Sequence, residues 1–247
     1  MIQYQRHKEI LAKLEVHQAM SIHRLAKELL TSESTIRRDL SDLEQQGMVR
    51  RVYGGVVLAK HTGVDMPAFH REQENIAKKQ QIVARAARLI EDGMSIFLDA
   101  ATTTTHIVPY LSSHKNLTVV TNSLILTEKL GELGQDCVRV FCTGGIYITN
   151  NKAFGGSAAI RMIESMRADL VLFSSRGITL DGEITDTSEL ENEVRRAMIR
   201  RARVRAFLCY DSKIRQQYVF KLCDRDGYDY IISNAPLPPE LSDAELS

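Results

Sequence analysis

The chain has 247 residues, of which 44% are hydrophobic and 26% charged, and its formal net charge is +1. This length and composition are typical of a globular protein of two domains, and the near-neutral charge excludes a chain that is basic throughout. No apolar stretch is long enough to cross a bilayer, and the first ten residues lack a signal-peptide core. We therefore expect a cytoplasmic protein with no membrane partner.

Near the N-terminus the sequence predicts two short amphipathic helices. Ser21 and Ser32 each precede an apolar pattern of helical spacing and can cap its first turn. The apolar positions of the two helices are Ile22, Leu25, Ala26 and Leu29, and then Ile36, Leu40 and Leu43. Only two residues separate the helices, which is typical of a helix-turn-helix unit whose second helix enters the DNA major groove.

A candidate DNA-binding surface follows from the polar face of the second helix and from the residues after it. Residues 48–58 are predicted to form two strands around a Gly54-Gly55 turn, a basic wing that would lie on the DNA backbone. A polar helix face alone is equally typical of simple solvent exposure, but the adjacent wing favours DNA. The candidate DNA contacts are Ser32, Ser34, Thr35, Arg37, Arg38, Ser41, Arg50, Arg51, Gly54 and Gly55.

The composition changes after this unit. Residues 59–72 are polar with little apolar pattern and are interpreted as a linker. A helix is predicted from Gln73 to the Asp92-Gly93 pair, where the glycine can end it. The predicted organisation is therefore a winged helix-turn-helix domain over 1–58, a linker over 59–72, an effector-binding domain over 73–235 and a C-terminal tail over 236–247.

The second domain alternates short apolar strands with helical segments, which predicts an α/β fold with a largely parallel sheet and helices on its faces. The six predicted strands are Ser95–Leu98, Leu117–Val120, Val138–Cys142, Leu170–Phe173, Ala206–Tyr210 and Tyr230–Ile232. Such sheets bind ligands beyond the carboxyl ends of their strands. The residues that follow the strands are therefore the candidates for a binding site.

Polar residues follow five of these strands and together suit a phosphorylated polyol. Thr102, Thr103, Thr104 and Lys213 are the candidates for a phosphate, Asn122 for sugar hydroxyls, and Arg176 for either the ligand or a partner subunit. The full set of candidate effector-binding residues is Asp99, Thr102, Thr103, Thr104, Asn122, Gly144, Gly145, Ser175, Arg176 and Lys213.

Neither a cofactor nor a metal is expected. No lysine stands at P-loop spacing near the threonines, which disfavours a nucleoside triphosphate. The four cysteines form no Cys-x-x-Cys pair and are interpreted as reduced structural thiols. The arginine-rich segment 188–203 carries Val194, Met198 and Ala202 on one stripe, which favours packing over a second DNA site.

The motifs resemble those of the DeoR family of bacterial transcriptional regulators over most of the chain. The family's Ser-x-x-Thr-Ile-Arg-Arg-Asp-Leu run matches residues 32–40, and its Asp-x-Gly-x-Thr-Thr element matches residues 99–104 with Ala101 in place of the glycine. Its Thr-Asn-Ser, Gly-Gly and terminal Asp-Ser-Ser-Lys elements resemble residues 121–123, 144–145 and 210–213. The resemblance implies a sensor domain similar in fold to ribose-5-phosphate isomerase.

The resemblance also implies a function. We expect a repressor of a carbohydrate-catabolism operon, acting as a homodimer or homotetramer on double-stranded operator DNA and released by a sugar phosphate. An activator would use the same contacts. The alternative from another class is a sugar-phosphate isomerase with an N-terminal regulatory domain, for which Asp99, Asp186, Glu189 and Lys213 could supply acid-base groups.

Overall fold

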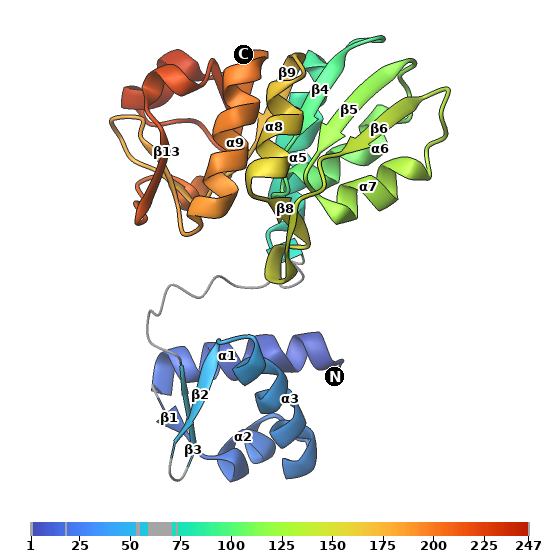
Figure 1. The fold of residues 1–247 in the computed structure, drawn as a ribbon. Coiled ribbons are helices and arrows are strands. Elements are labelled where there is room, and N and C mark those ends of the chain that lie inside the picture. The colour runs from blue at the N-terminus through green and yellow to red at the C-terminus, as the bar shows by residue number, and fades with distance from the viewer. Residues whose placement is uncertain (1, 18, 53–54, 59–70, 73, 247) are drawn as a thin grey trace. The chain divides into compact units, whose positions relative to one another are not determined.

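The computed structural model describes residues 2–17, 19–52, 55–58, 71–72 and 74–246, and they form two compact units divided between residues 70 and 71. The first contains α1 (Gln3–His17), β1 (Ala19–Met20), α2 (Ile22–Glu28), α3 (Glu33–Gln45), β2 (Val49–Val52) and β3 (Gly55–Leu58) (Figure 1). We call it the DNA-binding unit and the second the sensor unit. No helix in the described part of the chain is long and apolar enough to span a membrane.

The predicted helix-turn-helix and wing are confirmed in the DNA-binding unit. Ser21 accepts a hydrogen bond from the Arg24 amide and begins α2, while Ser32 accepts one from the Thr35 amide and begins α3. Strands β2 and β3 pair antiparallel across the wing, and β1 adds a third strand that the sequence analysis did not predict. Apolar residues of α1, α2, α3 and the sheet form one core, which includes Ile10, Leu25, Leu40 and Val56.

Helix α1 is joined to α3 by a buried carboxylate. Asp39 is 1% exposed and accepts two hydrogen bonds from Arg6, from Nε at 2.7 Å and from Nη2 at 3.1 Å. His7 Nε2 lies 3.3 Å from the same carboxylate. Asp39 lies within the arginine-rich run of α3, but it faces the protein instead of the solvent. It therefore fixes the helix that presents the candidate DNA contacts.

Replacing Asp39 with alanine is expected to destabilise the DNA-binding unit by about 1 to 3 kcal/mol, because Arg6 and His7 then lose a hydrogen-bonded charged partner. Hydrogen exchange at the amides of α1 and α3 measures this loss directly. Asp42→Ala is the matched control, since the Asp42 carboxylate accepts an exposed bond from Gln3, at 2.7 Å. Equal exchange rates in the two variants would contradict a special role for Asp39.

The sensor unit is built on a six-stranded parallel sheet in the order β14-β12-β9-β4-β5-β6. These strands are β4 (Ser95–Leu98), β5 (Leu117–Thr121), β6 (Val138–Cys142), β9 (Ala168–Phe173), β12 (Ala202–Cys209) and β14 (Tyr230–Ser233). All six predicted strands are confirmed, and so is the α/β class. The sheet is hydrogen-bonded through its centre at β9 and β4, the two strands that precede most of the candidate site residues.

Helices cover both faces of this sheet, in three layers. One face packs on α5 (Ile76–Ala86), α6 (Val108–Leu111) and α7 (Leu124–Gly131), and the other on α8 (Ser157–Glu164) and α9 (Glu189–Arg201), which lie side by side (Figure 1). Helix α5 ends at Ala86, earlier than predicted, and continues as a 3-10 turn over Ala87–Leu89. After the threonines, a 3-10 turn over Thr104–Ile107 leads into α6.

Two small sheets were not predicted. Strands β7 (Ile146–Ile148) and β8 (Ala153–Gly155) form a hairpin, and β10 (Gly177–Ile178), β11 (Ile184–Asp186) and β13 (Phe220–Cys223) form an antiparallel sheet. The stretch assigned to a C-terminal tail contains a 3-10 helix over Pro239–Ala244, whose Leu241 and Ala244 belong to the core. That stretch is therefore packed onto the domain.

The four cysteines are free thiols in the structure. Burial raises the pKa of both Cys209 and Cys223 to about 12, which keeps these two thiols protonated.

Candidate functional site

The first candidate site is the exposed face of α3. Ser34, Arg37 and Arg38 are exposed on the side opposite the buried Ile36 and Leu40. The Ser32 hydroxyl caps the helix and lies 2.8 Å from the hydroxyls of both Ser34 and Thr35. Arg37 contacts Glu33 at 3.3 Å in an exposed pair that DNA phosphates can replace at little cost.

The wing is tied to this face by an arginine. Arg51 Nη2 donates to the Arg37 carbonyl at 3.0 Å and to the Ser41 hydroxyl at 2.8 Å. Arg50, on the same strand, is exposed. Arg51 and Ser41 therefore hold the wing against α3, and of the two wing arginines Arg50 is the more open to an outside ligand.

Of the two wing glycines proposed as DNA contacts, the structure describes one. Gly54 lies outside the described residues. Gly55 packs its backbone on β1: a Cβ atom there would lie 2.4 Å from the Met20 carbonyl oxygen. This close approach explains the glycine by packing, without a DNA contact.

Replacing Arg37 or Arg38 with alanine is expected to weaken operator binding by about 1 to 3 kcal/mol each, with relaxed sequence preference where the arginine contacts a base. Fluorescence anisotropy at a fixed, near-physiological salt concentration measures the loss. Arg203→Ala on the sensor unit removes the same charge and serves as the control. Unchanged affinity in both α3 variants would show that another face of the unit meets the groove.

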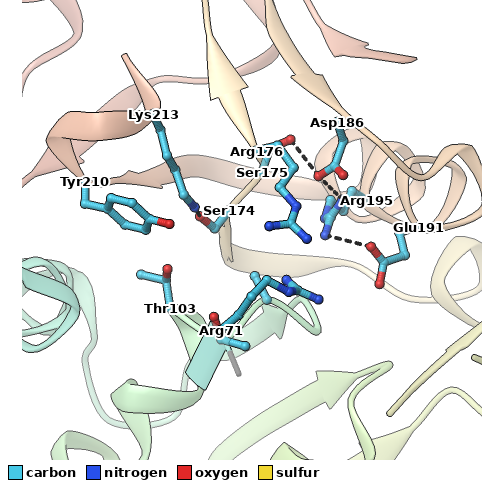
Figure 2. A pocket seen from close by; sticks show the side chains of 12 residues that line it. Arg71, Thr103, Ser174, Ser175, Arg176, Asp186, Glu191, Arg195, Tyr210 and Lys213 are labelled. Carbon is cyan, nitrogen blue, oxygen red and sulfur yellow. Dashed lines mark hydrogen bonds and ion pairs between the residues drawn. The ribbon is translucent and has the colours of Figure 1, made fainter. Parts of the chain in front are cut away.

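The second candidate site is a polar pocket in the sensor unit, with an empty volume of about 360 Å³ that includes open solvent. It lies where β4, β9 and β12 end, as expected for a parallel sheet. Its lining carries four cationic and two acidic side chains (Figure 2). The lining residues are Arg71, Ala101, Thr102, Thr103, Ser174, Ser175, Arg176, Asp186, Glu191, Arg195, Tyr210 and Lys213.

Arg195 of α9 organises one wall of this pocket. Its guanidinium donates to Asp99 at 2.9 Å and to Asp186 at 2.9 Å, and lies 3.5 Å from Glu191. The side chain is 6% exposed. Although burial alone raises the pKa of Asp186, the charges of Arg195 and Arg176 hold it below its ordinary value. The positive charge of Arg195 is thus balanced by the neighbouring carboxylates, and the residue mainly holds this wall of the pocket in place.

Asp99 shapes the loop after β4 from behind the pocket. Its Oδ1 accepts from the Ala101 amide at 3.2 Å and the Thr104 hydroxyl at 2.6 Å, and its Oδ2 accepts from the Ser174 amide at 3.1 Å and from Arg195. Asp99 and Thr104 were candidate effector contacts, but neither lines the pocket. Their hydrogen bonds leave Thr102 and Thr103 to face it.

Lys213 lines the pocket and is buried. Its ammonium donates to the Ser174 hydroxyl at 2.7 Å and lies 4.5 Å from the centre of the Tyr210 ring. Burial lowers the pKa of Lys213 to about 7, and the charge of Arg176 acts in the same direction. Burial likewise lowers the pKa of Arg176. A buried cation and a half-buried cation in one pocket favour an anionic ligand.

Three other candidates do not reach this pocket. Asn122 donates from Nδ2 to the Phe154 carbonyl at 2.9 Å, so it fixes the β7-β8 hairpin. Gly145 has a φ of +111°, and a Cβ there would lie 2.4 Å from the Gly155 carbonyl oxygen. Gly144 also has a positive φ, of 59°. Backbone conformation and packing account for this glycine pair, while Thr102, Thr103, Ser175, Arg176 and Lys213 are brought together in the pocket.

Several lining residues were not among the effector candidates. Ser174 adjoins the candidate Ser175, and Tyr210 directly follows β12, so the strand-end rule could have included both. Asp186 appeared only as a possible catalytic acid, and Glu191, Arg195 and Arg71 carry no local signal. The structure shows no cluster of three or more potential metal ligands among the residues it describes.

A winged helix-turn-helix unit joined to a parallel-sheet unit with a charged pocket defines the class of ligand-responsive transcriptional regulators. Residues 6–62 match the model of the DeoR-like helix-turn-helix domain, and residues 74–235 match that of the DeoR C terminal sensor domain. The chain belongs to the DeoR family of transcriptional regulators.

Its relatives carry the names of regulators. The HTH-type transcriptional regulator GolR of Listeria innocua is 30% identical over 100% of this chain and 98% of its own length. The glycerol-3-phosphate regulon repressor of Escherichia coli is 27% identical over 96% of this chain and 93% of its own length. The L-fucose operon activator of Haemophilus influenzae is 31% identical over 90% of this chain and 88% of its own length. These names support a sugar-responsive DNA-binding regulator and do not favour the isomerase.

Among solved structures, ribose 5-phosphate isomerase A of Methanocaldococcus jannaschii aligns with 57% of this chain and 55% of its own, with a TM-score of 0.41 and 11% identity.

Proposed function

We propose that this regulator is a repressor of a carbohydrate-catabolism operon and that a phosphorylated sugar, bound in the pocket of the sensor unit, releases it from its operator. The observation that carries the proposal is the charge of the pocket. Four cationic side chains face only two acidic ones, and hydroxyl groups lie beside them. Because Arg195 is engaged with carboxylates, Arg71, Arg176 and Lys213 are the cations that suit a phosphate, and the hydroxyls suit a polyol.

On the DNA side, α3 and the wing would read an operator half-site. Because operators that bind such units repeat or invert their half-sites, we propose a homodimer or homotetramer. A coupling free energy of about 1 to 3 kcal/mol between the two sites would be enough for regulation.

Genomic DNA capture tests the proposal. Sheared DNA of the source organism is retained on the purified full chain at near-physiological salt and sequenced, and an enriched fragment is then titrated with hexose and pentose phosphates and with the same sugars unphosphorylated. We expect enriched sites beside carbohydrate genes and release by one phosphorylated sugar. Uniform, salt-labile retention, or equal release by the unphosphorylated sugar, would overturn it.

The affinity for the effector is expected to fall as the pH rises above 7. Below pH 7 Lys213 is protonated with or without ligand, because its pKa is about 7. Above that value the free protein loses the proton, and a bound anion must restore it, so the affinity falls by up to about tenfold per pH unit until the pKa of the complex is reached.

Calorimetric titration between pH 7 and 9 measures this effect, since a phosphate ester with a second pKa of about 6 is already a dianion there. Proton uptake should appear as a dependence on the ionisation enthalpy of the buffer. In Lys213→Met, the proton uptake that we assign to Lys213 should be lost. A flat profile in the unmodified chain would show that Lys213 keeps its charge state on binding.

A further inference from the structure

Arg71 stands at the point where the sensor unit begins. The division between the two units falls between residues 70 and 71, and the other residues that line the pocket lie between Ala101 and Lys213. Figure 2 shows the Arg71 side chain reaching into the pocket beside Thr103, across from Arg176. The first residue of the sensor unit therefore lines the pocket.

The main chain of Arg71 is bound to a pocket threonine through a buried lysine. Lys79 of α5 is 1% exposed, and its ammonium donates both to the Arg71 carbonyl and to the Thr102 hydroxyl, the latter at 3.1 Å. A buried ammonium requires such oxygen partners, because a buried donor without one is costly. Any ligand that moves Thr102 thus acts on Lys79, which is also the donor to the Arg71 carbonyl.

The side chain of Arg71 is bound to the opposite wall. Its Nη2 donates to Asn151 Oδ1, and Asn151 Nδ2 donates to Glu191 at 2.6 Å. Glu191 in turn lies 3.5 Å from Arg195. The next residue, Glu72, accepts a hydrogen bond from Lys129 of α7 at 2.9 Å. Both ends of Arg71 therefore belong to the network around the pocket.

We propose that Arg71 is itself an effector contact, and that the effector acts on the DNA-binding unit by fixing this residue and the segment after it. The inference rests on the proposed function. A phosphate placed between Arg176 and Lys213 lies opposite the Arg71 guanidinium, whose N–H fork matches phosphate oxygens. Binding then exchanges the present partners of Arg71 for the ligand, and the position at which the chain enters the sensor unit changes with occupancy.

Inorganic phosphate is a suitable probe, because it tests the anion site without knowledge of the sugar. In the full chain, phosphate should raise the melting temperature and slow hydrogen exchange in two peptides, one covering residues 71–79 and one covering residues 174–178. In Arg71→Gln the phosphate affinity should fall on the order of tenfold, as for the loss of one charge-assisted hydrogen bond. Exchange over 174–178 should still slow at saturation, whereas exchange over 71–79 should not respond.

Two further variants complete the design. Arg71→Lys keeps the charge but not the N–H fork. Its phosphate affinity and its exchange response over residues 71–79 should lie between those of the unmodified chain and those of Arg71→Gln, which separates loss of the contact from loss of folding. Arg203→Gln removes an exposed arginine of the same unit, paired with Asp169 at 3.7 Å, and should behave as the unmodified chain. If Arg71→Gln keeps both responses, the role of Arg71 is overturned while the anion pocket stands. If phosphate affects neither peptide in the unmodified chain, the pocket proposal and this inference fail together.

Discussion

Replacing Arg195 with methionine is expected to lower the free energy of unfolding of the sensor unit by about 3 to 5 kcal/mol, because it leaves buried carboxylates without their shared cation. Asp99, Asp186 and Glu191 converge on this guanidinium, and none of the three is more than 5% exposed. Removing the charge leaves carboxylates that must be protonated or hydrated. Methionine fills much of the same volume, so the loss measures charge more than packing.

Urea unfolding of the full chain, followed by hydrogen exchange at the amides of β4 and β9, measures this effect. Arg203→Met is the control, and it should change stability by less than about 1 kcal/mol because its ion pair is exposed. A loss in Arg195→Met no larger than in the control would mean that the carboxylates are compensated in another way. Arg195 would then be free to act as a ligand contact.

Replacing Lys213 with methionine is expected to leave operator affinity unchanged in the absence of effector and to abolish release by the effector. Lys213 is 8% exposed in the pocket of the sensor unit, where it can meet an anion, whereas the surface that we assign to DNA belongs to the DNA-binding unit. Lys213 forms no ion pair among the described residues and donates to the Ser174 hydroxyl, so its exchange for methionine leaves no buried charge without its partner. Loss of response should therefore not reflect unfolding.

Operator anisotropy with and without the releasing sugar phosphate measures both halves of this prediction. Lys78→Met is the matched control, since Lys78 holds Asp211, two residues before Lys213, in an exposed ion pair at 2.6 Å. The control should respond as the unmodified chain does. If the Lys213→Met variant is released from the operator at the effector concentration that releases the unmodified chain, Lys213 has only a structural role.

The sequence was sufficient for the parts of the site that local patterns encode. Parallel strands place their carboxyl ends at one edge, so Thr102, Ser175 and Lys213 could be grouped although they are far apart in the chain. The helix-turn-helix could be predicted because its caps and apolar positions follow helical spacing. In both cases the signal lies within a few residues of the feature that it predicts.

The residues that were missed depend on long-range packing. Arg195 stands in a helix with Arg196, Arg200 and Arg201, and nothing in this run marks one arginine as buried, since its partner Asp99 lies 96 residues away. The strand-end rule also selects residues that turn away: Asn122 follows β5 but bonds to Phe154, 32 residues later. A rule about position along a strand does not determine which way a side chain faces.

The close packing of Gly55 on Met20 has a mechanical consequence for DNA recognition. Strands β1 and β3 pair at Met20 and Val56. The chain between these two residues, which contains α2, α3 and β2, therefore forms a loop that is closed at its base by strand pairing. We therefore expect α3 and the wing to respond together, not separately, to a poorly fitting base pair, which would sharpen the choice between correct and incorrect DNA.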